Sequence, residues 1–374
     1  MAKTFSWITA GIIFFVFLAL GTFLSIHKPL WTDEIYTAQA GIEPRSYQQL
    51  LKGELTQEAN NFPLYYIYQK AVTDLLGYRL TQQWDDTHFI YEQRGQIILR
   101  IPSNISVAFA LTFLILFFLR SKDPFSAGIS SLLLLSSYMT WAYWPEARPY
   151  ALWYSLSIIH GLLLIKTLRE GSSKNILALT LIHWLLAFTS FVSLIQIVLA
   201  NLLFFHVKER GVKNFFCLNS PLPVIFFYAS LGLSTTARLT MNPVGLISLV
   251  LPLEWIGVLI LCGLIFLWRK DFFTRPQILF TVFFIGLCAG TGGILSLAAI
   301  RNSPPPATAL YYRHFIFLTP YAVFMVTLVL KHLWQHYRFS RWATINIVLL
   351  ISGLFVTTAL RTAIALCENI IYLF

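Results

Sequence analysis

Long apolar runs separated by short polar segments repeat along the whole chain. Most of these runs contain about 20 residues, and a helix of that length crosses the roughly 30 Å hydrocarbon core of a bilayer. The expected membrane-spanning segments are 5–26, 100–119, 125–143, 150–168, 175–190, 191–207, 215–235, 244–267, 277–300, 312–331 and 342–362. The run 175–207 is too long for one straight helix, so we expect a turn at "FTSF", residues 188–191. The pattern predicts an all-α polytopic membrane protein with about 11 transmembrane helices.

The amino-acid composition agrees with this interpretation. The chain is 57% hydrophobic and only 11% charged, with a mean hydropathy of +0.68, whereas about a quarter of the residues in a soluble domain are charged. We therefore expect one integral membrane module over residues 1–374, with no C-terminal soluble domain. The first apolar run is longer than the core of a signal peptide, and no small-x-small cleavage site precedes Asp33. We expect this run to be retained as the first span.

The distribution of charge indicates an orientation in the membrane. A net charge of +11 could suggest a nucleic-acid partner, but the Lys and Arg residues are not clustered on one face or tail, so no nucleic acid is expected. With the N-terminus in the cytoplasm, the short inner loops carry most of the basic residues and few of the acidic ones, as the positive-inside rule requires. We expect a bacterial inner or plasma membrane protein whose large loops face away from the cytoplasm. The four scattered cysteines indicate packing rather than a zinc or disulfide framework.

The first extracytoplasmic loop, residues 28–99, is the largest expected polar region. It contains the segment "FPLYYIYQKAVTDLLGY" (62–78), in which aromatic and aliphatic residues recur at helical spacing beside one charged side. This pattern predicts a juxtamembrane helix that lies in the interface. Such a helix could also do no more than brace the first span.

Ionisable residues gather at the expected outer ends of the spans. The adjacent acids Asp33 and Glu34 follow the first span, and "YWPEARPY" places Glu146 close to Arg148. Further basic residues at the same depth are Arg100, Arg313 and His314. A charge at a span end can be an anchor that reaches the head groups, and Glu146 with Arg148 can be a local ion pair. A carboxylate gains little stabilisation from a position at the membrane edge. The presence of acids there therefore favours a functional site.

These side chains suit a substrate that carries both a lipid and a phosphate. A carboxylate at an apolar boundary has its charged form disfavoured, which brings its pKa toward the range of a general base. Arginines bind phosphate through paired hydrogen bonds. The sequence contains no GxGxxG, Walker-type or HExxH motif. His332 and His336 have a metal-binding spacing, but no acid or Cys stands near them, and packing is the preferred interpretation.

Several of these segments resemble motifs of the GT-C glycosyltransferases, specifically those related to protein O-mannosyltransferases and lipid A aminoarabinose transferases. The acid pair after the first span looks like their early acid motif. "NFPLYYIYQKAV" (61–72) is similar to their "HPPLYY" segment, and "YWPEARPYAL" to their "SQEARPYAL" turn. "LRIPSN" at the second span and the late "YYRHFIFLTPY" are similar to their "RLPS" and "RYLLPALP" segments. The likeness in sequence covers about residues 1–170. The rest of the chain resembles the family only in the layout of its spans and in the late motif.

The resemblance implies an inverting enzyme that moves a sugar from a polyprenyl-phosphate donor to an extracytoplasmic acceptor, which is a lipid, a glycan or a protein. It implies that Asp33 is the catalytic base, that Glu34 assists or orients it, and that Glu146 orients the acceptor or a metal ion. The residues that it implies for binding the donor phosphate are Arg100, Arg148, Arg313 and Lys70. Those that it implies along the sugar or lipid path are Tyr65, Tyr66 and His314, although a plain interfacial aromatic belt would also place the two tyrosines there.

The chain departs from the family pattern at Asn61–Phe62–Pro63, which replaces His-Pro-Pro and leaves the role of that histidine without a counterpart. Asp33, Glu146 and His314 could hold a divalent metal ion, although their spacing does not require one. Two other functions stay open, a transporter or flippase of lipid-linked sugars and a non-catalytic membrane scaffold. A transporter should carry charges or broken helices near mid-membrane, where the expected spans place only Glu254. The position of the acids favours the enzyme.

Overall fold

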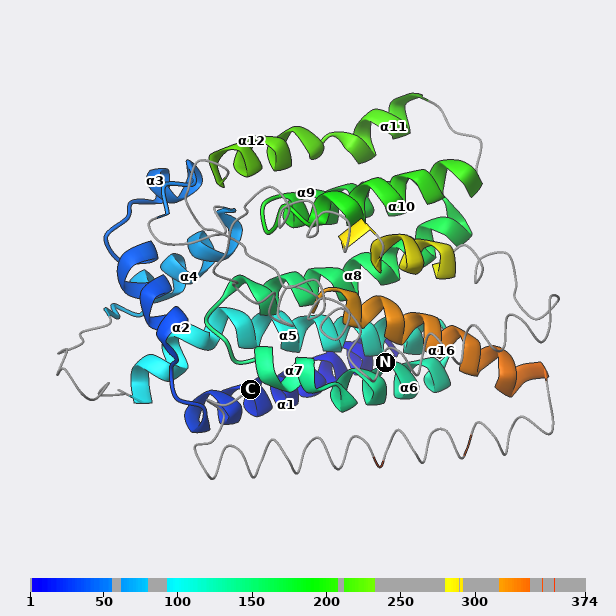
Figure 1. Ribbon diagram of the computed structural model, residues 1–374. Coiled ribbons are helices and arrows are strands. Elements are labelled where there is room, and N and C mark those ends of the chain that lie inside the picture. Colours follow the sequence, from blue (N-terminus) through cyan, green and yellow to red (C-terminus); the bar gives the residue numbers. More distant parts are fainter. Residues whose placement is uncertain are drawn as a thin grey trace, which may run out of the picture.

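The computed structural model describes residues 2–55, 62–79, 93–207, 212–232, 280–288, 290–291 and 316–336, together with positions 345 and 353. Within these ranges the chain forms helices and no strand (Figure 1). The long helices are α1 (Ala2–His27), α5 (Gln93–Arg120), α8 (Pro149–Glu170) and α16 (Leu318–His336). The helices of intermediate length are α4 (Leu64–Leu75), α6 (Pro124–Ser136), α9 (Ser173–Ala187), α10 (Ser193–Val207) and α12 (Leu222–Gly232). The short ones are α2 (Thr32–Tyr36), the π-helix η1 (Thr37–Ile42), α3 (Tyr47–Leu51), α7 (Tyr138–Tyr143) and α11 (Val212–Asn219).

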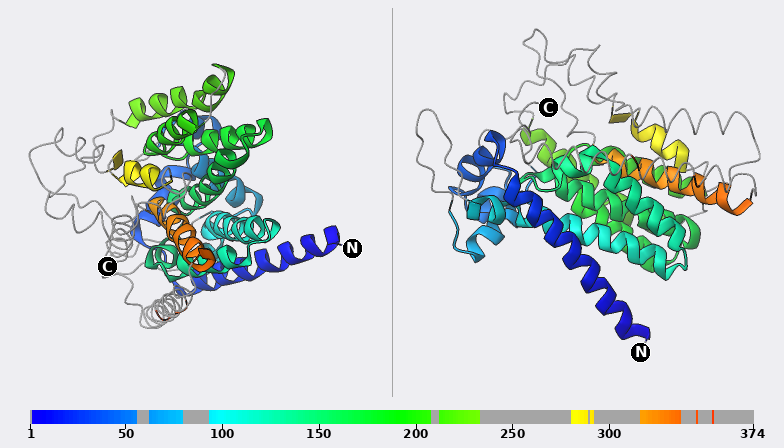
Figure 2. Two further views of the ribbon diagram at one scale, coloured as in Figure 1. Left: turned by 90° about the vertical axis from the view of Figure 1, so that its right-hand side faces the viewer. Right: turned by 90° about the horizontal axis from the view of Figure 1, so that it is seen from below.

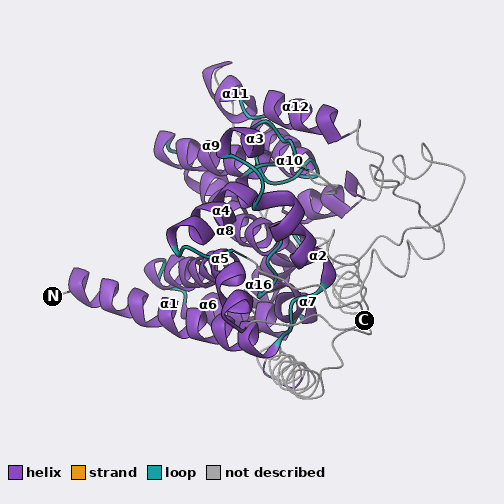
Figure 3. Cartoon of the chain, turned by 90° about the vertical axis from the view of Figure 1, so that its left-hand side faces the viewer, coloured by secondary structure: helices purple, strands orange, loops and turns teal. Residues whose placement is uncertain are grey.

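The long helices pack side by side in an order that partly follows the sequence. α5 contacts α1 on one side and α8 on the other, and α9 and α10 cover α8 (Figure 1). α16 returns to the bundle from the far end of the sequence and contacts α6 and α8. α1 extends away from the other helices toward its N-terminus (Figure 2). The helices α2, η1, α3 and α4 of the first loop lie together at one end of the bundle (Figure 3).

The helices have the length and apolarity of membrane spans. Four are long and apolar enough to cross a bilayer, Trp7–His27, Arg94–Arg120, Pro149–Glu170 and Asn214–Leu231. Protein atoms bury 83% of the most apolar stretch of Pro149–Glu170 but only 22% of that of Trp7–His27. The exposed side chains of α1 include Trp7, Phe15 and Phe23, which are suited to contact with lipid. The chain is a helical membrane protein.

One of the expected spans is wrong as a single helix, and a second one is interrupted. The span expected at 125–143 divides into α6 and α7 at Ser137, whose backbone is extended (φ −78°, ψ 123°). The Trp141 indole donates to the Leu135 carbonyl at 2.6 Å across this break, and so satisfies one of the carbonyls that a helix end leaves open. The span expected at 215–235 is present as the candidate span Asn214–Leu231, but it is interrupted at Ser220–Pro221 between α11 and α12, because proline disfavours the helical conformation of the residue before it.

Other expectations for the fold are confirmed. α9 ends at Ala187 and α10 begins at Ser193, so the long run 175–207 turns where "FTSF" predicts. The helix expected within 62–78 is α4. The span expected at 244–267 lies outside the described residues, as do most of 277–300 and 342–362. The total of about 11 spans therefore stays a prediction.

A series of hydrogen bonds connects five helices in the interior of the bundle. The His183 Nδ1 atom lies 3.1 Å from the Leu218 carbonyl, so it carries a proton, and its Nε2 accepts from His160 Nε2 at 3.2 Å. His160 Nδ1 then accepts from the Tyr321 hydroxyl at 2.7 Å. That hydroxyl in turn accepts from Gln196 at 2.8 Å. These hydrogen bonds fix both histidines as neutral tautomers and join α8, α9, α10, α11 and α16, as buried polar groups in a membrane must find partners.

Candidate functional site

The end of the bundle that carries the first loop also carries most of the predicted site residues. Five of them, Asp33, Glu34, Arg100, Glu146 and Arg148, form a connected group that we call the carboxylate cluster. They come from α2, from α5 and from the turn between α7 and α8. The prediction that these distant segments come together is confirmed for these five residues, whereas their depth in a membrane stays a prediction.

Arg100 lies inside α5, two turns after its first residue, and its side chain is completely buried. Its Nε and Nη2 atoms donate to the two oxygens of Glu34 at 2.9 and 2.6 Å. Its remaining donors reach the carbonyls at the end of α1 and just beyond it, those of Ser25, Lys28 and Pro29. A guanidinium has five N–H donors, and all five are used here. The expectation that Arg100 binds the donor phosphate does not fit this geometry, because no donor is left for a phosphate.

Glu34 is the partner of Arg100 and is also completely buried. Its carboxylate accepts the Ala147 amide at 2.6 Å and the Trp31 amide at 3.2 Å, in addition to Arg100. Burial alone would raise the pKa of Glu34, but the Arg100 and Lys28 charges and the hydrogen bonds outweigh burial and hold the pKa below its usual value. Glu34 is therefore an ionised structural group that ties the first loop to the turn before α8.

Asp33, the neighbouring acid, has a different environment. Its side chain is 34% exposed, against 0% for that of Glu34. Successive residues of a helix point about 100° apart, and the short helix α2 therefore turns one acid inward and the other toward the surface. The Asp33 carboxylate lies 3.7 Å from the guanidinium of Arg148. Asp33 is the acid of this pair that is accessible from the surface.

Arg148 is held beside Asp33 by backbone geometry and by hydrogen bonds. It is the extended residue before Pro149, the first residue of α8, which is the conformation that a following proline favours. Its Nη1 donates to the Asp33 carbonyl at 3.1 Å and to the Thr37 hydroxyl at 2.8 Å. The guanidinium also lies over the Tyr150 ring, 5.8 Å from its centroid. Arg148 thus presents a fixed positive charge at the edge of the exposed carboxylate.

Glu146 is a buried carboxyl group with one unsatisfied oxygen. Its Oε1 accepts from Lys28 Nζ at 3.2 Å, and its Oε2 has no hydrogen-bond partner among the described residues. Burial is the largest influence on its pKa and raises it, with help from the nearby Glu34 charge and against the attraction of Lys28. Glu146 is therefore a buried carboxyl group whose pKa lies above its usual value, which is typical of groups that exchange protons in functional sites.

Lys28 is a site residue that the sequence prediction missed. Its ammonium donates to the Ala142 carbonyl at 2.7 Å as well as to Glu146, and the side chain is 10% exposed. The available signal was its position, because a lysine directly after the first span, on the expected outer side, runs against the positive-inside rule.

Tyr65 and Tyr66, the predicted aromatic residues, are buried next to the carboxylate cluster. The Tyr65 hydroxyl lies 3.1 Å from Ser103 Oγ, and Ser103 donates to the backbone carbonyl of Glu146. Tyr65 and Tyr66 are both fully buried. Both belong to an apolar cluster with Ile42, Leu50 and Leu55, so they connect α4 to the other first-loop helices rather than line an open surface, which differs from the substrate path expected for them.

Lys70 belongs to a separate group of charges on the first loop. Its ammonium lies 3.5 Å from the Asp74 carboxylate and 5.5 Å from the centroid of the Tyr47 ring. Asp74 also pairs with Arg79 at 2.8 Å and accepts from the Tyr47 hydroxyl at 2.9 Å. No contact in the described part of the chain joins Lys70 to the carboxylate cluster, so its role toward phosphate stays a prediction.

The late motif lies outside the described residues, and with it Arg313 and His314. Within the described ranges no three His, Cys, Asp or Glu side chains are grouped as ligands of a metal ion would be. A metal site made by Asp33, Glu146 and His314 therefore stays a prediction. Comparison with known proteins adds no assignment, since no protein-family model and no curated protein matches the chain.

Proposed function

We propose that the chain is an inverting glycosyltransferase that moves a sugar from a polyprenyl-phosphate donor to an extracytoplasmic lipid, glycan or protein. The observation that carries the proposal is that the two adjacent acids, Asp33 and Glu34, have different environments. Glu34 is locked to Arg100 inside the protein, while Asp33 is exposed beside the charge of Arg148. Burial and the ion pair with Arg100 give Glu34 a structural role, whereas the ion pair of Asp33 with Arg148 is partly exposed and contributes little stability at this distance, so Asp33 is the acid that can contact a substrate.

In the proposed reaction Asp33 takes the proton from the acceptor hydroxyl or amine. The acceptor atom forms a bond to the anomeric carbon from the face opposite the phosphate, and the bond from that carbon to the phosphate oxygen breaks. The electron pair leaves with the polyprenyl phosphate, whose growing negative charge is stabilised by the Arg148 guanidinium. Glu146 lies one residue away from the Ala147 amide that binds Glu34, and it orients the acceptor through its unsatisfied oxygen.

A site at the ends of the helices suits a substrate that is anchored in the membrane. A polyprenyl phosphate keeps its chain among the lipids and its phosphate at the interface, where the first-loop helices meet α5 and α8. The positive-inside distribution of Lys and Arg supports an extracytoplasmic position of this end of the bundle.

The test uses the purified full-length protein, polyprenyl-phosphate mannose or glucose as donor, and extracted cell-envelope material as acceptor. Asp33→Asn is expected to lower the rate of polyprenyl phosphate release by a factor of about 10² or more. Asp74→Asn is the matched control, because Asp74 is an acid in an ion pair of the same loop, and it should retain activity. Near-normal turnover by a folded Asp33→Asn protein would overturn the proposal. Movement of the donor across vesicles without release of polyprenyl phosphate would favour the flippase instead.

A further inference from the structure

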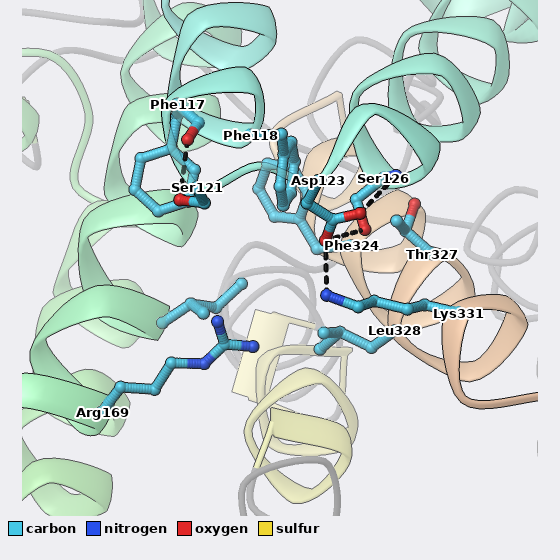
Figure 4. Close-up of a pocket in the computed structure, with 11 residues that line it drawn as sticks. Phe117, Phe118, Ser121, Asp123, Ser126, Arg169, Phe324, Thr327, Leu328 and Lys331 are labelled. Atoms are coloured by element: carbon cyan, nitrogen blue, oxygen red, sulfur yellow. Dashed lines mark hydrogen bonds and ion pairs between the residues drawn. The ribbon is translucent and has the colours of Figure 1, made fainter. Parts of the chain in front are cut away.

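The ion pair of Asp33 and Arg148 is more open than a second ion pair between distant segments of the chain. In the cavity between α5, α8 and α16, Asp123 contacts Lys331 at 2.5 Å and accepts from the Ser126 amide and hydroxyl (Figure 4). The Asp123 side chain is 13% exposed, whereas that of Asp33 is 34% exposed and lies 3.7 Å from Arg148. A ligand can therefore approach Asp33 and Arg148 without first breaking a short hydrogen-bonded pair.

The short helix α2 divides its residues between a buried and an exposed face. Glu34 and Ile35 are buried, and Ile35 packs in an apolar cluster that includes Ala147. Asp33 and Tyr36 are three residues apart, which places them about 60° apart around a helix. Both side chains reach the surface, and Tyr36 is 42% exposed. The exposed face of α2 therefore carries a carboxylate and an aromatic ring next to each other.

The two tyrosines on the other side of the ion pair are already engaged. The Arg148 guanidinium lies over the Tyr150 ring, 5.8 Å from its centroid. Tyr143 packs edge-on against Tyr150, with 5.9 Å between the ring centroids. Both tyrosines are less exposed than Tyr36. Of these three rings, that of Tyr36 is the best placed to contact a ligand.

A sugar ring suits this combination of side chains. One face of a pyranose carries mainly C–H bonds, and their slightly positive hydrogens pack well against the negative face of an aromatic ring. A pyranose is about 5 Å across, and side chains three residues apart on a helix have Cβ atoms about 5–6 Å apart. A sugar packed against Tyr36 therefore extends to Asp33 and to the charge of Arg148.

An exposed tyrosine at a membrane interface can also serve as an anchor. Tyr47 of α3 provides the comparison, because it is exposed to a similar degree, 45%. Its hydroxyl donates to Asp74, and Lys70 lies over its ring, so it belongs to the separate group of charges on the first loop. The two tyrosines thus allow the contribution of an exposed ring on this loop to be separated from that of a ring beside the carboxylate cluster.

We propose that Tyr36 is a further substrate-binding residue, against which the sugar ring of the polyprenyl-phosphate donor packs. This inference rests on the proposed function. In that reaction the anomeric carbon is bonded to the phosphate beside Arg148, and an acceptor atom beside Asp33 attacks it from the opposite face. The sugar lies between these two groups, over the exposed face of α2. Tyr36 thereby holds the ring in the orientation that turns the anomeric carbon toward the acceptor.

The experiment measures binding of two ligands to the purified full-length protein in nanodiscs without an acceptor. One ligand is a short-chain polyprenyl-phosphate mannose or glucose, and the other is the same polyprenyl phosphate without a sugar. Tyr36→Leu is expected to weaken binding of the sugar-bearing ligand about tenfold and to leave the affinity for the sugar-free ligand unchanged. Tyr36→Phe keeps the ring and should bind both ligands as the unchanged protein does. Tyr47→Leu, the matched control, should change neither affinity.

Two results would overturn the inference and leave the proposed function standing. The first is a Tyr36→Leu protein of unchanged melting temperature that binds the sugar-bearing ligand as tightly as the unchanged protein does. The second is an equal loss for both ligands, which would make Tyr36 a contact of the lipid or an interfacial anchor. An unchanged protein that binds neither ligand would instead overturn the proposed function, and the inference with it.

Discussion

Arg100 and Glu34 form a bidentate ion pair, with donor–acceptor distances of 2.9 and 2.6 Å, and neither side chain has any exposed surface. The pair joins α5 to the first loop at the point where that loop leaves α1. Each partner therefore depends on the other for its charge balance, and the stability of this end of the bundle depends on both.

Removal of one partner should be strongly destabilising. Arg100→Met leaves the Glu34 carboxylate buried without its cation, and the expected loss in the free energy of unfolding is about 3–5 kcal/mol. The double variant Arg100→Met with Glu34→Met removes both charges and should recover a large part of this loss. Unfolding in mixed micelles measures all three proteins. A single variant as stable as the unchanged protein would contradict the structural role given to the pair.

Glu146 should make stability depend on pH in the direction opposite to an ordinary ion pair. Its pKa is raised above the usual value of 4.5, chiefly by burial, so between 4.5 and its folded pKa the folded protein holds a proton that the unfolded chain has lost. This contribution to stability falls as the pH rises through that window. Glu146→Gln, which cannot titrate, should remove this fall in the melting temperature, whereas Glu54→Gln on the exposed loop should not. An unchanged pH profile in Glu146→Gln would contradict the raised pKa.

Arg148 should contribute to binding of the donor rather than to folding. Its guanidinium is 11% exposed beside Asp33, and loss of a charged hydrogen-bonding group in contact with phosphate costs about tenfold or more in affinity. Arg148→Ala is therefore expected to weaken binding of a short-chain polyprenyl phosphate by that factor. Arg79→Ala, which removes a cation paired with Asp74 on the same loop, is the control. Equal affinities of the two variants would remove Arg148 from the phosphate site.

The interior hydrogen-bond chain predicts a large effect for a small change. Tyr321→Phe removes one oxygen, and both His160 Nδ1 and one Gln196 hydrogen lose their partner. A cost of about 1–3 kcal/mol is expected for leaving such groups buried and unsatisfied. The melting temperature should fall clearly below that of Tyr68→Phe, a change of the same kind on α4. A Tyr321→Phe protein with an unchanged melting temperature would show that the chain does not hold the bundle together.

The sequence predicts the helices better than their interruptions. α1, α5 and α8 follow from apolar runs of span length, and the turn between α9 and α10 follows from a run that is too long for one helix. The break at Ser137 was missed because both of its sides are equally apolar. Its cause is a contact, the bond from the Trp141 indole to the Leu135 carbonyl, and hydropathy contains no information on such a contact.

The site could be predicted only as a set of neighbours. The sequence brought Asp33, Glu34 and Glu146 to one depth, but it could not separate the roles of two adjacent acids, since the direction of each side chain depends on how α2 sits on α5. The sequence also led to the prediction that Arg100 binds phosphate. It does not show that the carbonyls at the end of the first span accept hydrogen bonds from the Arg100 guanidinium. Lys28 was missed for a related reason, since its burial depends on the turn that carries Ala142 and Glu146.

The bonds from Arg100 to the carbonyls of Ser25, Lys28 and Pro29 also bear on how the protein is made. α1 leaves the ribosome well before α5, so its terminal carbonyls cannot yet have the donors that later saturate them. Entry of the first helix into the bilayer and its final docking are consequently two separate events during synthesis. The second event fixes the exit direction of the first loop, and the position of Asp33 is thus decided only after residue 100 has been translated.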